Sequence, residues 1–173
     1  MIVKCIANNI NDLPESLRDF AFTQDENGNL DVSVGKLYAV YGKERRDGRW
    51  FYLVHTDNDN KVSFWWMPAD LYAVTDDSEP AMWQEIEDGL FSYQSLGKWQ
   101  VSEGLIDKDV SAIAEFNGEV ANDSSFPTEE TLNKLNEAFY AEQNQARHES
   151  ADILSRERGW DKKLFEETEE SNQ

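Results

Sequence analysis

The most regular pattern along the chain lies between residues 32 and 75, where short hydrophobic blocks alternate with polar ones. Four of these blocks are rich in aromatic and β-branched residues: Leu37–Tyr41, Trp50–His55, Val62–Trp66 and Leu71–Val74. Blocks of this length and composition, separated by turn-forming residues, are typical of antiparallel strands. We therefore predict a strand in each block and a further strand over residues 1–7, which are also mostly apolar.

The residues between the blocks have the chemistry of tight turns. Asp47-Gly48 predicts a hairpin loop. Asp57–Asn60 predicts a second polar turn, and Pro68–Asp70 predicts a short 3₁₀ turn. Residues 8–31 are polar and predict a long excursion from the sheet, with one helical turn near Glu15–Arg18.

The pattern after residue 75 is less regular. Glu79-Pro80 predicts the start of a short helix that continues through Met82, Trp83 and Ile86, and Gly89 ends it. Three later stretches are compatible either with further strands or with irregular packing, and the pattern leaves both alternatives open. These stretches are Leu90–Tyr93, Trp99–Val101 and Ser111–Phe116.

Residues 127–158 carry the pattern of a long helix. Pro127 suits the first turn, and Glu129 and Glu130 suit the positive end of the helix dipole. Apolar positions recur along one face, and we expect this face to be buried against the β-rich part of the chain. The positions are Leu132, Leu135 and Phe139.

The apolar face of this helix thins after Phe139, where acidic and small residues replace it. The second half of the helix is therefore expected either to project into solvent or to form a dimer contact. Trp160, Leu164 and Phe165 are apolar, and we expect their side chains to anchor the chain again after the helix. Residues 166–173 are mostly acidic and polar, and we predict a disordered tail.

Together these patterns predict an α+β protein with a small antiparallel SH3-like β-barrel or meander and a long C-terminal helix. Residues 1–126 form the β-rich domain, with the barrel core at about 1–75 and an irregular extension at 76–126. Residues 127–165 form the helix packed on it, followed by the tail.

Part of this expectation comes from a family resemblance. The segments that carry it are Val34–Tyr41 (VGKLYAVY), Trp50–Val54 (WFYLV) and Trp65–Tyr72 (WWMPADLY). Their order and spacing resemble small bacterial proteins of the SH3-like barrel type, some of which are proposed as immunity proteins of polymorphic toxin systems. In those proteins a Val-Gly-Lys-x-Tyr strand opens the barrel, and a Trp-x-Pro-Ala-x-Leu-Phe/Tyr segment leads into its last strand. The resemblance covers residues 1–75 at most and includes no catalytic residue.

The net charge of the chain is the feature that bears most on its binding partners. Thirty-five Asp and Glu stand against 16 Lys and Arg, which gives a formal net charge of −19 on 173 residues. A charge of this sign repels nucleic acids and anionic membranes and attracts cationic partners. We therefore predict a basic protein as the partner, without nucleic-acid or membrane binding. Aromatic residues make up 12% of the chain, which is enough to expect a folded core.

Candidate chemistry is sparse. His55 and His148 lie on different predicted elements, and Cys5 lies in an apolar run typical of a buried side chain. The acidic turn at Asp57–Asn60 lacks the glycine and glutamate of a calcium loop. No phosphate-binding glycine motif is present. We predict no enzyme activity, no metal and no cofactor.

The cellular location follows from what the sequence lacks. A single cysteine excludes an internal disulfide and suits a reducing compartment. No signal peptide and no apolar run of membrane-spanning length is visible, so we predict a cytoplasmic protein.

Trp65 and Trp66 are neighbours on a predicted strand, so their side chains point to opposite faces. One of them is expected outside the barrel, either covered by the C-terminal helix or by residues 80–126, or exposed as a binding hot spot. The pattern does not say which of the two is exposed.

Our hypothesis from the sequence is an acidic inhibitor, or immunity-type binding protein, that neutralises a basic protein such as a nuclease toxin. The alternative is a nucleic-acid mimic that blocks a DNA-binding protein. The sequence identifies neither the partner nor the oligomeric state. The residues predicted to contact the partner are Asp57, Asp59, Trp65, Asp76, Asp77, Trp83, Glu85, Glu87 and Asp88.

Overall fold

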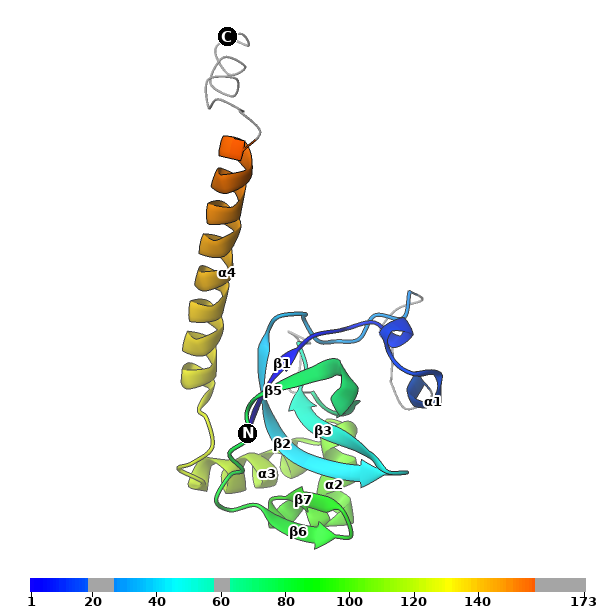
Figure 1. Ribbon diagram of the computed structural model, residues 1–173. Helices are drawn as coiled ribbons and strands as arrows, with labels where there is room; N and C mark the ends of the chain where they lie inside the picture. The colour runs from blue at the N-terminus through cyan, green and yellow to red at the C-terminus, as the bar shows by residue number, and fades with distance from the viewer. Residues whose placement is uncertain (19–26, 58–62, 158–173) are drawn as a thin grey trace, which may run out of the picture. The chain divides into compact units, whose positions relative to one another are not determined.

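The computed structural model describes residues 1–18, 27–57 and 63–157 (Figure 1). The chain divides into two compact units, Met1–Leu132 and Asn133–Gln173. The first unit holds all the strands and the shorter helices, together with the start of the last helix. The α+β class predicted from the sequence is confirmed.

The strands of the first unit pair antiparallel throughout. In chain order they are β1 (Ile2–Cys5), β2 (Leu37–Arg46), β3 (Arg49–His55), β4 (Phe64–Pro68), β5 (Tyr72–Asp76), β6 (Gln84–Glu87) and β7 (Leu90–Ser92). The longest strand, β2, is the centre of the sheet. It pairs with β3 over most of its length, with β1 through its first residues and with β7 through Gly42–Glu44.

Local turn chemistry explains the hairpin at the centre of the sheet. Asp47 and Gly48 join β2 to β3, and both have a positive φ, 50° and 79°. This left-handed pair matches the twist of the flanking strands, as Asp-Gly sequences favour. The hairpin predicted at Asp47-Gly48 is therefore confirmed. So is the 3₁₀ turn before β5, which covers Ala69–Leu71.

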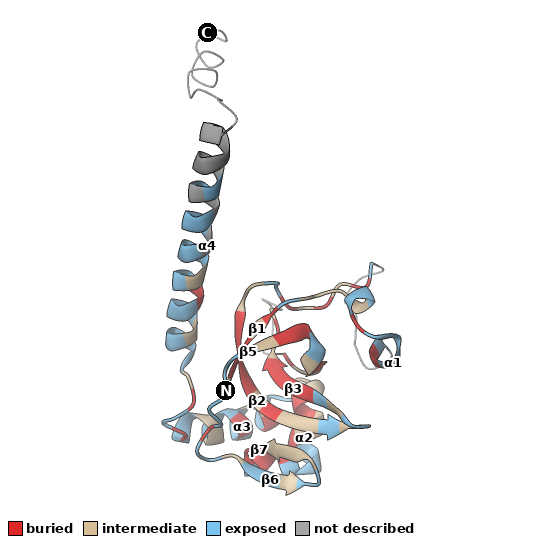
Figure 2. Cartoon of the chain, in the orientation of Figure 1, coloured by how far each residue is buried: buried red, intermediate tan, exposed pale blue. Residues whose placement is uncertain are grey.

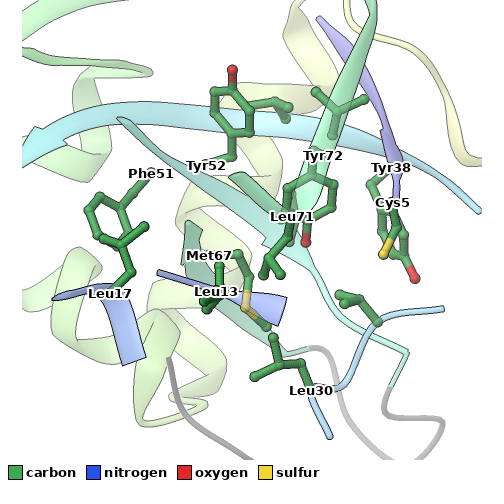
Figure 3. Packing of buried hydrophobic residues seen from close by; sticks show 14 residues of the cluster. Cys5, Leu13, Leu17, Leu30, Tyr38, Phe51, Tyr52, Met67, Leu71 and Tyr72 are labelled. Atoms are coloured by element: carbon green, nitrogen blue, oxygen red, sulfur yellow. The ribbon is translucent and has the colours of Figure 1, made fainter. Parts of the chain in front are cut away.

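Both faces of the central strands are buried, as Figure 2 shows by the red along β1, β2 and β3. On one face the polar excursion contributes Leu13, Leu17 and Leu30 to a cluster with Met67 and Leu71 (Figure 3). The excursion contains the one-turn helix α1 (Glu15–Arg18), as predicted, and also a 3₁₀ turn at Ile10–Asp12 that the sequence pattern did not predict.

On the other face two helices complete a second cluster. They are α2 (Trp99–Ile106) and α3 (Val110–Asn122), preceded by a 3₁₀ turn at Gln94–Gly97. Their buried side chains include Val101, Leu105 and Phe116, which pack with Leu53 and Phe64 of the sheet.

The barrel expected from the sequence is not closed. Among the described residues, β4 pairs only with β3 and β5 pairs only with β1, so the sheet is open. The physical reason is that the second apolar face is covered by α2 and α3. A sheet whose two faces are both covered has no need to fold onto itself to bury them.

Residues 76–126 also differ from the expectation of an irregular extension. The helix predicted through Met82 and Ile86 is wrong, because this stretch ends in β6, which forms a hairpin with β7 around Gly89 at φ 80°. The strand alternative at Leu90–Tyr93 is confirmed by β7.

The strand or irregular alternatives at Trp99–Val101 and Ser111–Phe116 are wrong, because both stretches are helical. Asp109 caps α3, since its carboxylate accepts hydrogen bonds from the backbone N–H groups of Ser111 and Ala112, each at 2.9 Å.

The contact between α2 and α3 depends on a glycine. A Cβ at Gly104 would lie 2.4 Å from the Cβ of Ala112, whereas one at Gly118 in α3 would meet nothing within 4 Å. We expect Gly104→Ala to lower the free energy of unfolding by about 1–3 kcal/mol, since the helices must separate.

The control for this substitution is Gly118→Ala, which is expected to raise the same free energy by about 0.5–1 kcal/mol through helix propensity. Urea unfolding of both variants measures this difference. Equal effects of the two substitutions would contradict the close packing of α2 on α3.

The long predicted helix is confirmed as α4 (Glu129–Glu157). The hydroxyl of Thr128 caps it by accepting a hydrogen bond from the N–H of Thr131 at 3.1 Å, so Pro127 precedes the first turn. Leu132 packs on the second cluster, while Leu135 is 40% exposed. The packing of the rest of the helix on the β-rich domain stays a prediction. The predictions on Asp59, the anchoring aromatics and the tail lie outside the described residues.

Candidate functional site

The first unit contains a pocket of about 390 Å³ between the sheet and the segment that follows α3. Neighbouring strands supply one wall, and the end of α3 and the first turn of α4 supply the other. The strand residues are Tyr41, His55 and Phe64. The residues from the helical side are Asn117, Val120, Ala121, Asp123, Phe126, Pro127, Thr128 and Glu129.

Aromatic rings form the apolar part of this pocket. The ring centroid of Tyr41 lies 4.9 Å from that of Phe64, edge to face, and 4.7 Å from that of Phe126. Burial raises the pKa of the Tyr41 hydroxyl to about 12, and the charge of Glu129 acts in the same direction. Tyr41 therefore stays neutral at physiological pH, and the pocket presents an uncharged aromatic wall.

His55 stands at the end of β3, paired in register with Phe64 of β4. The two rings are perpendicular, with centroids 5.5 Å apart. Burial lowers the pKa of His55 below its ordinary value and outweighs the opposing influences of the backbone hydrogen bond with Thr56 and of the charge of Glu129. The imidazole is therefore neutral at pH 7. The sequence pattern assigned no binding role to His55, whereas the structure brings it into the pocket.

Asp123 fixes the wall where α3 ends. Its carboxylate accepts hydrogen bonds from the N–H of Met82 at 3.0 Å, from the N–H and hydroxyl of Ser125 at 2.9 and 2.6 Å, and from the hydroxyl of Tyr93 at 3.4 Å. Burial alone would raise the pKa of Asp123, but these hydrogen bonds outweigh it and lower the pKa. Asp123 is thus an ionised structural group that ties the end of α3 to the segment between β5 and β6.

A second feature is a segment with uncompensated negative charge. Residues 62–97 contain seven Asp and Glu and no Lys or Arg. We call residues 76–88 the acidic segment, since six of these seven acids lie there, all of them exposed. Glu79 pairs with Lys43. Within the described part of the chain, the other five form no ion pair, and these are Asp76, Asp77, Glu85, Glu87 and Asp88.

Asp57 differs from these five carboxylates because it has partners inside the fold. Its carboxylate pairs with Lys36 and accepts a 2.6 Å hydrogen bond from the hydroxyl of Tyr38. Burial would raise the pKa of Asp57, but the bonds from Lys36 and Tyr38 prevail and lower it. The negative charge of Asp57 is therefore largely compensated inside the fold.

Trp65, Trp66 and Trp83 are each partly buried. Trp65 packs on the first cluster, and its indole N–H donates to the hydroxyl of Ser63 at 2.9 Å. Trp66 and Trp83 pack on both clusters. Neither Trp65 nor Trp66 is fully exposed, because the excursion and the helices cover the two faces of the sheet.

Sequence reasoning missed most of the pocket. Asn117, Phe126 and Glu129 reach it only because α3 packs against the sheet, and the pattern did not predict α3. A histidine at the end of an apolar strand, as at His55, was the one local signal.

Three further findings bear on function. No group of His, Cys, Asp and Glu with the arrangement of a metal site occurs among the described residues. No helix in the described ranges is long and apolar enough to cross a membrane. No protein family, curated protein or solved structure showed a significant similarity to the chain. The functional argument therefore rests on the residues of this chain.

Proposed function

We propose that the protein is an acidic inhibitor of the immunity type, which binds and neutralises a basic protein such as a nuclease toxin domain. The observation that carries this proposal is the acidic segment, where five exposed carboxylates form no ion pair among the described residues, although the N-terminal ammonium of Met1 exerts a favourable influence on Asp76. Like charges held together on a folded surface repel one another. A cationic partner relieves that repulsion, so it is the natural complement of this surface.

The charge of the whole first unit supports the same proposal. Residues 1–132 carry 25 Asp and Glu against 10 Lys and Arg. A nuclease binds phosphates and therefore presents a cationic cleft, which this field steers toward the inhibitor. Steering of this kind raises the association rate between oppositely charged proteins.

The acidic segment also has features of a contact surface beyond its charge. Strand β6 pairs with β7 alone among the described strands, so one of its edges is unpaired. Val74 in β5 and Met82 in the segment that joins β5 to β6 are 50% and 42% exposed. Exposed apolar side chains among polar ones are the usual composition of a protein interface.

The proposal is tested in two stages. Co-purification from the native host identifies the partner, which must be a basic protein whose activity the inhibitor suppresses. Association kinetics with that partner are then measured by stopped flow at several salt concentrations. We expect the association rate to fall steeply with salt, since the Debye length is about 8 Å at physiological ionic strength.

Charge reversal locates the contact. Glu85→Lys with Glu87→Lys is expected to slow association by about tenfold, because it removes steering charge at the contact. The matched control is Glu137→Lys with Glu142→Lys in α4, which changes the net charge equally at exposed positions and is expected to act much less. An association rate independent of salt, or an acidic partner, would exclude charge neutralisation. Contacting carboxylates spaced like phosphates along one elongated face, rather than gathered in one patch, would favour the nucleic-acid mimic instead.

A further inference from the structure

The pocket beside His55 is a second feature with binding character, and it lies outside the acidic segment. Its volume of about 390 Å³ falls in the range of pockets that hold small ligands, about 300–1,000 Å³. It combines aromatic walls with a few polar groups, as such pockets do. The question is which chemistry its residues select.

The charges around the pocket favour a cation. Two carboxylates, Asp123 and Glu129, line it, and the described lining includes no Lys or Arg. Asp123 is saturated by hydrogen bonds inside the protein. Glu129 is exposed and forms no ion pair within the described residues. Glu129 therefore offers both of its carboxylate oxygens to a ligand.

The N-terminus of α4 has the opposite preference, because the helix dipole attracts anions there. Glu129 and Glu130 already occupy the first turn and meet that preference. A free anion would face their two negative charges and the net charge of the whole chain. These charges favour a cation over an anion at the rim of the pocket despite the dipole.

The aromatic wall narrows the choice of cation. Tyr41, Phe64 and Phe126 provide neutral rings, and such rings attract cations through their π-faces. A planar guanidinium stacks on aromatic rings and is less strongly hydrated than an ammonium group, so it loses less on entering an apolar pocket. Its five N–H donors also need acceptors, which Glu129 and the side-chain amide of Asn117 supply. Neutral His55 adds no repulsion.

We propose that this pocket binds an alkylguanidinium group, the side chain of an arginine on the basic partner. The source of the arginine rests on the proposed function, but the guanidinium specificity belongs to the pocket and is tested without any partner. Arginine-rich surfaces are expected on proteins that bind phosphates, because the planar fork of the guanidinium matches phosphate oxygens.

The test is an NMR titration of the full chain with N-acetyl-arginine amide. The chain has only two histidines, so the imidazole protons of His55 and His148 are assigned with the variant His148→Gln. We expect the His55 signals to shift in a saturable way while those of His148 stay in place. The neutral isostere N-acetyl-citrulline amide is expected to bind about tenfold more weakly, since it lacks the charge that the rings and Glu129 attract.

A matched pair of variants tests the role of the rim. Glu129→Gln is expected to weaken binding of the arginine probe about fivefold, whereas Glu130→Gln removes the same charge from the same helical turn outside the lining and is expected to have little effect. Equal binding of the citrulline probe, or shifts of both histidines together, would overturn the proposal. The two proposals can also fail separately. If the acidic-segment variants bind the partner normally while the pocket still binds the arginine probe, the role proposed for the acidic segment is contradicted and the pocket proposal stands.

Discussion

Replacing Phe116 by alanine is expected to lower the free energy of unfolding by about 3–5 kcal/mol. Phe116 is fully buried, and it joins α3 to the sheet. Its ring packs against Phe64 at 5.5 Å, Tyr93 at 5.8 Å and Tyr41 at 6.1 Å between centroids. The substitution removes these contacts and leaves a cavity that the sheet on one side and the helices on the other cannot easily fill.

Chemical denaturation followed by tryptophan fluorescence measures this loss. The control is Val110→Ala at the start of the same helix, where the side chain is 80% exposed and little change is expected. Binding of the arginine probe to the pocket is a second measurement, because Tyr41 and Phe64, which pack on Phe116, both line the pocket. A Phe116→Ala protein that unfolds within 1 kcal/mol of the original would show that α3 contributes little to the second core cluster.

The second large effect is expected at Asp123. Replacing this residue by asparagine keeps its shape but removes the charge that accepts hydrogen bonds from Met82, Ser125 and Tyr93. Bonds to a charged group contribute more than neutral ones, and a buried donor left unsatisfied costs about 1–3 kcal/mol. We expect Asp123→Asn to destabilise the protein by about 3 kcal/mol at pH 7.

The pH dependence of this effect has a definite sign. The pKa of Asp123 is lower in the folded protein than its ordinary value of 3.8, so the unfolded chain binds the proton more readily. The stabilisation is fully present above pH 5 and is lost as the pH falls through the folded pKa. The stability difference between the original protein and Asp123→Asn should therefore shrink between about pH 5 and pH 3. A difference that stays constant across this range would refute an ionised Asp123.

The parts of the fold that were predictable are those determined by local chemistry. The left-handed pair Asp47-Gly48 needs no distant contact to form its turn, and the aromatic blocks on either side of it determine the strands. The long helix was equally visible, because its acidic first turn and the spacing of its apolar residues are sequence signals.

Helices α2 and α3 were not predictable in the same way. Helix α3 contains β-branched and aromatic residues and a central glycine, all of which weaken helix propensity. Helix α2 begins at Trp99 without a side-chain cap. Burial of Val101, Leu105 and Phe116 against the sheet overrides these weak local preferences. The pocket depends on the same tertiary contacts, so its residues could not be brought together from the pattern alone.

The three strands that pair with β2 become available at different times as the chain is synthesised. Its hairpin with β3 is complete once His55 has left the ribosome, but the edge at Gly42–Glu44 stays unpaired until Leu90–Ser92 emerge. An unpaired edge is a template for association with other chains. Charged side chains at and next to this edge oppose such association in the nascent chain, and these are Lys43, Glu44 and Arg45. Any shortened form that ends before β7 would keep this edge open permanently.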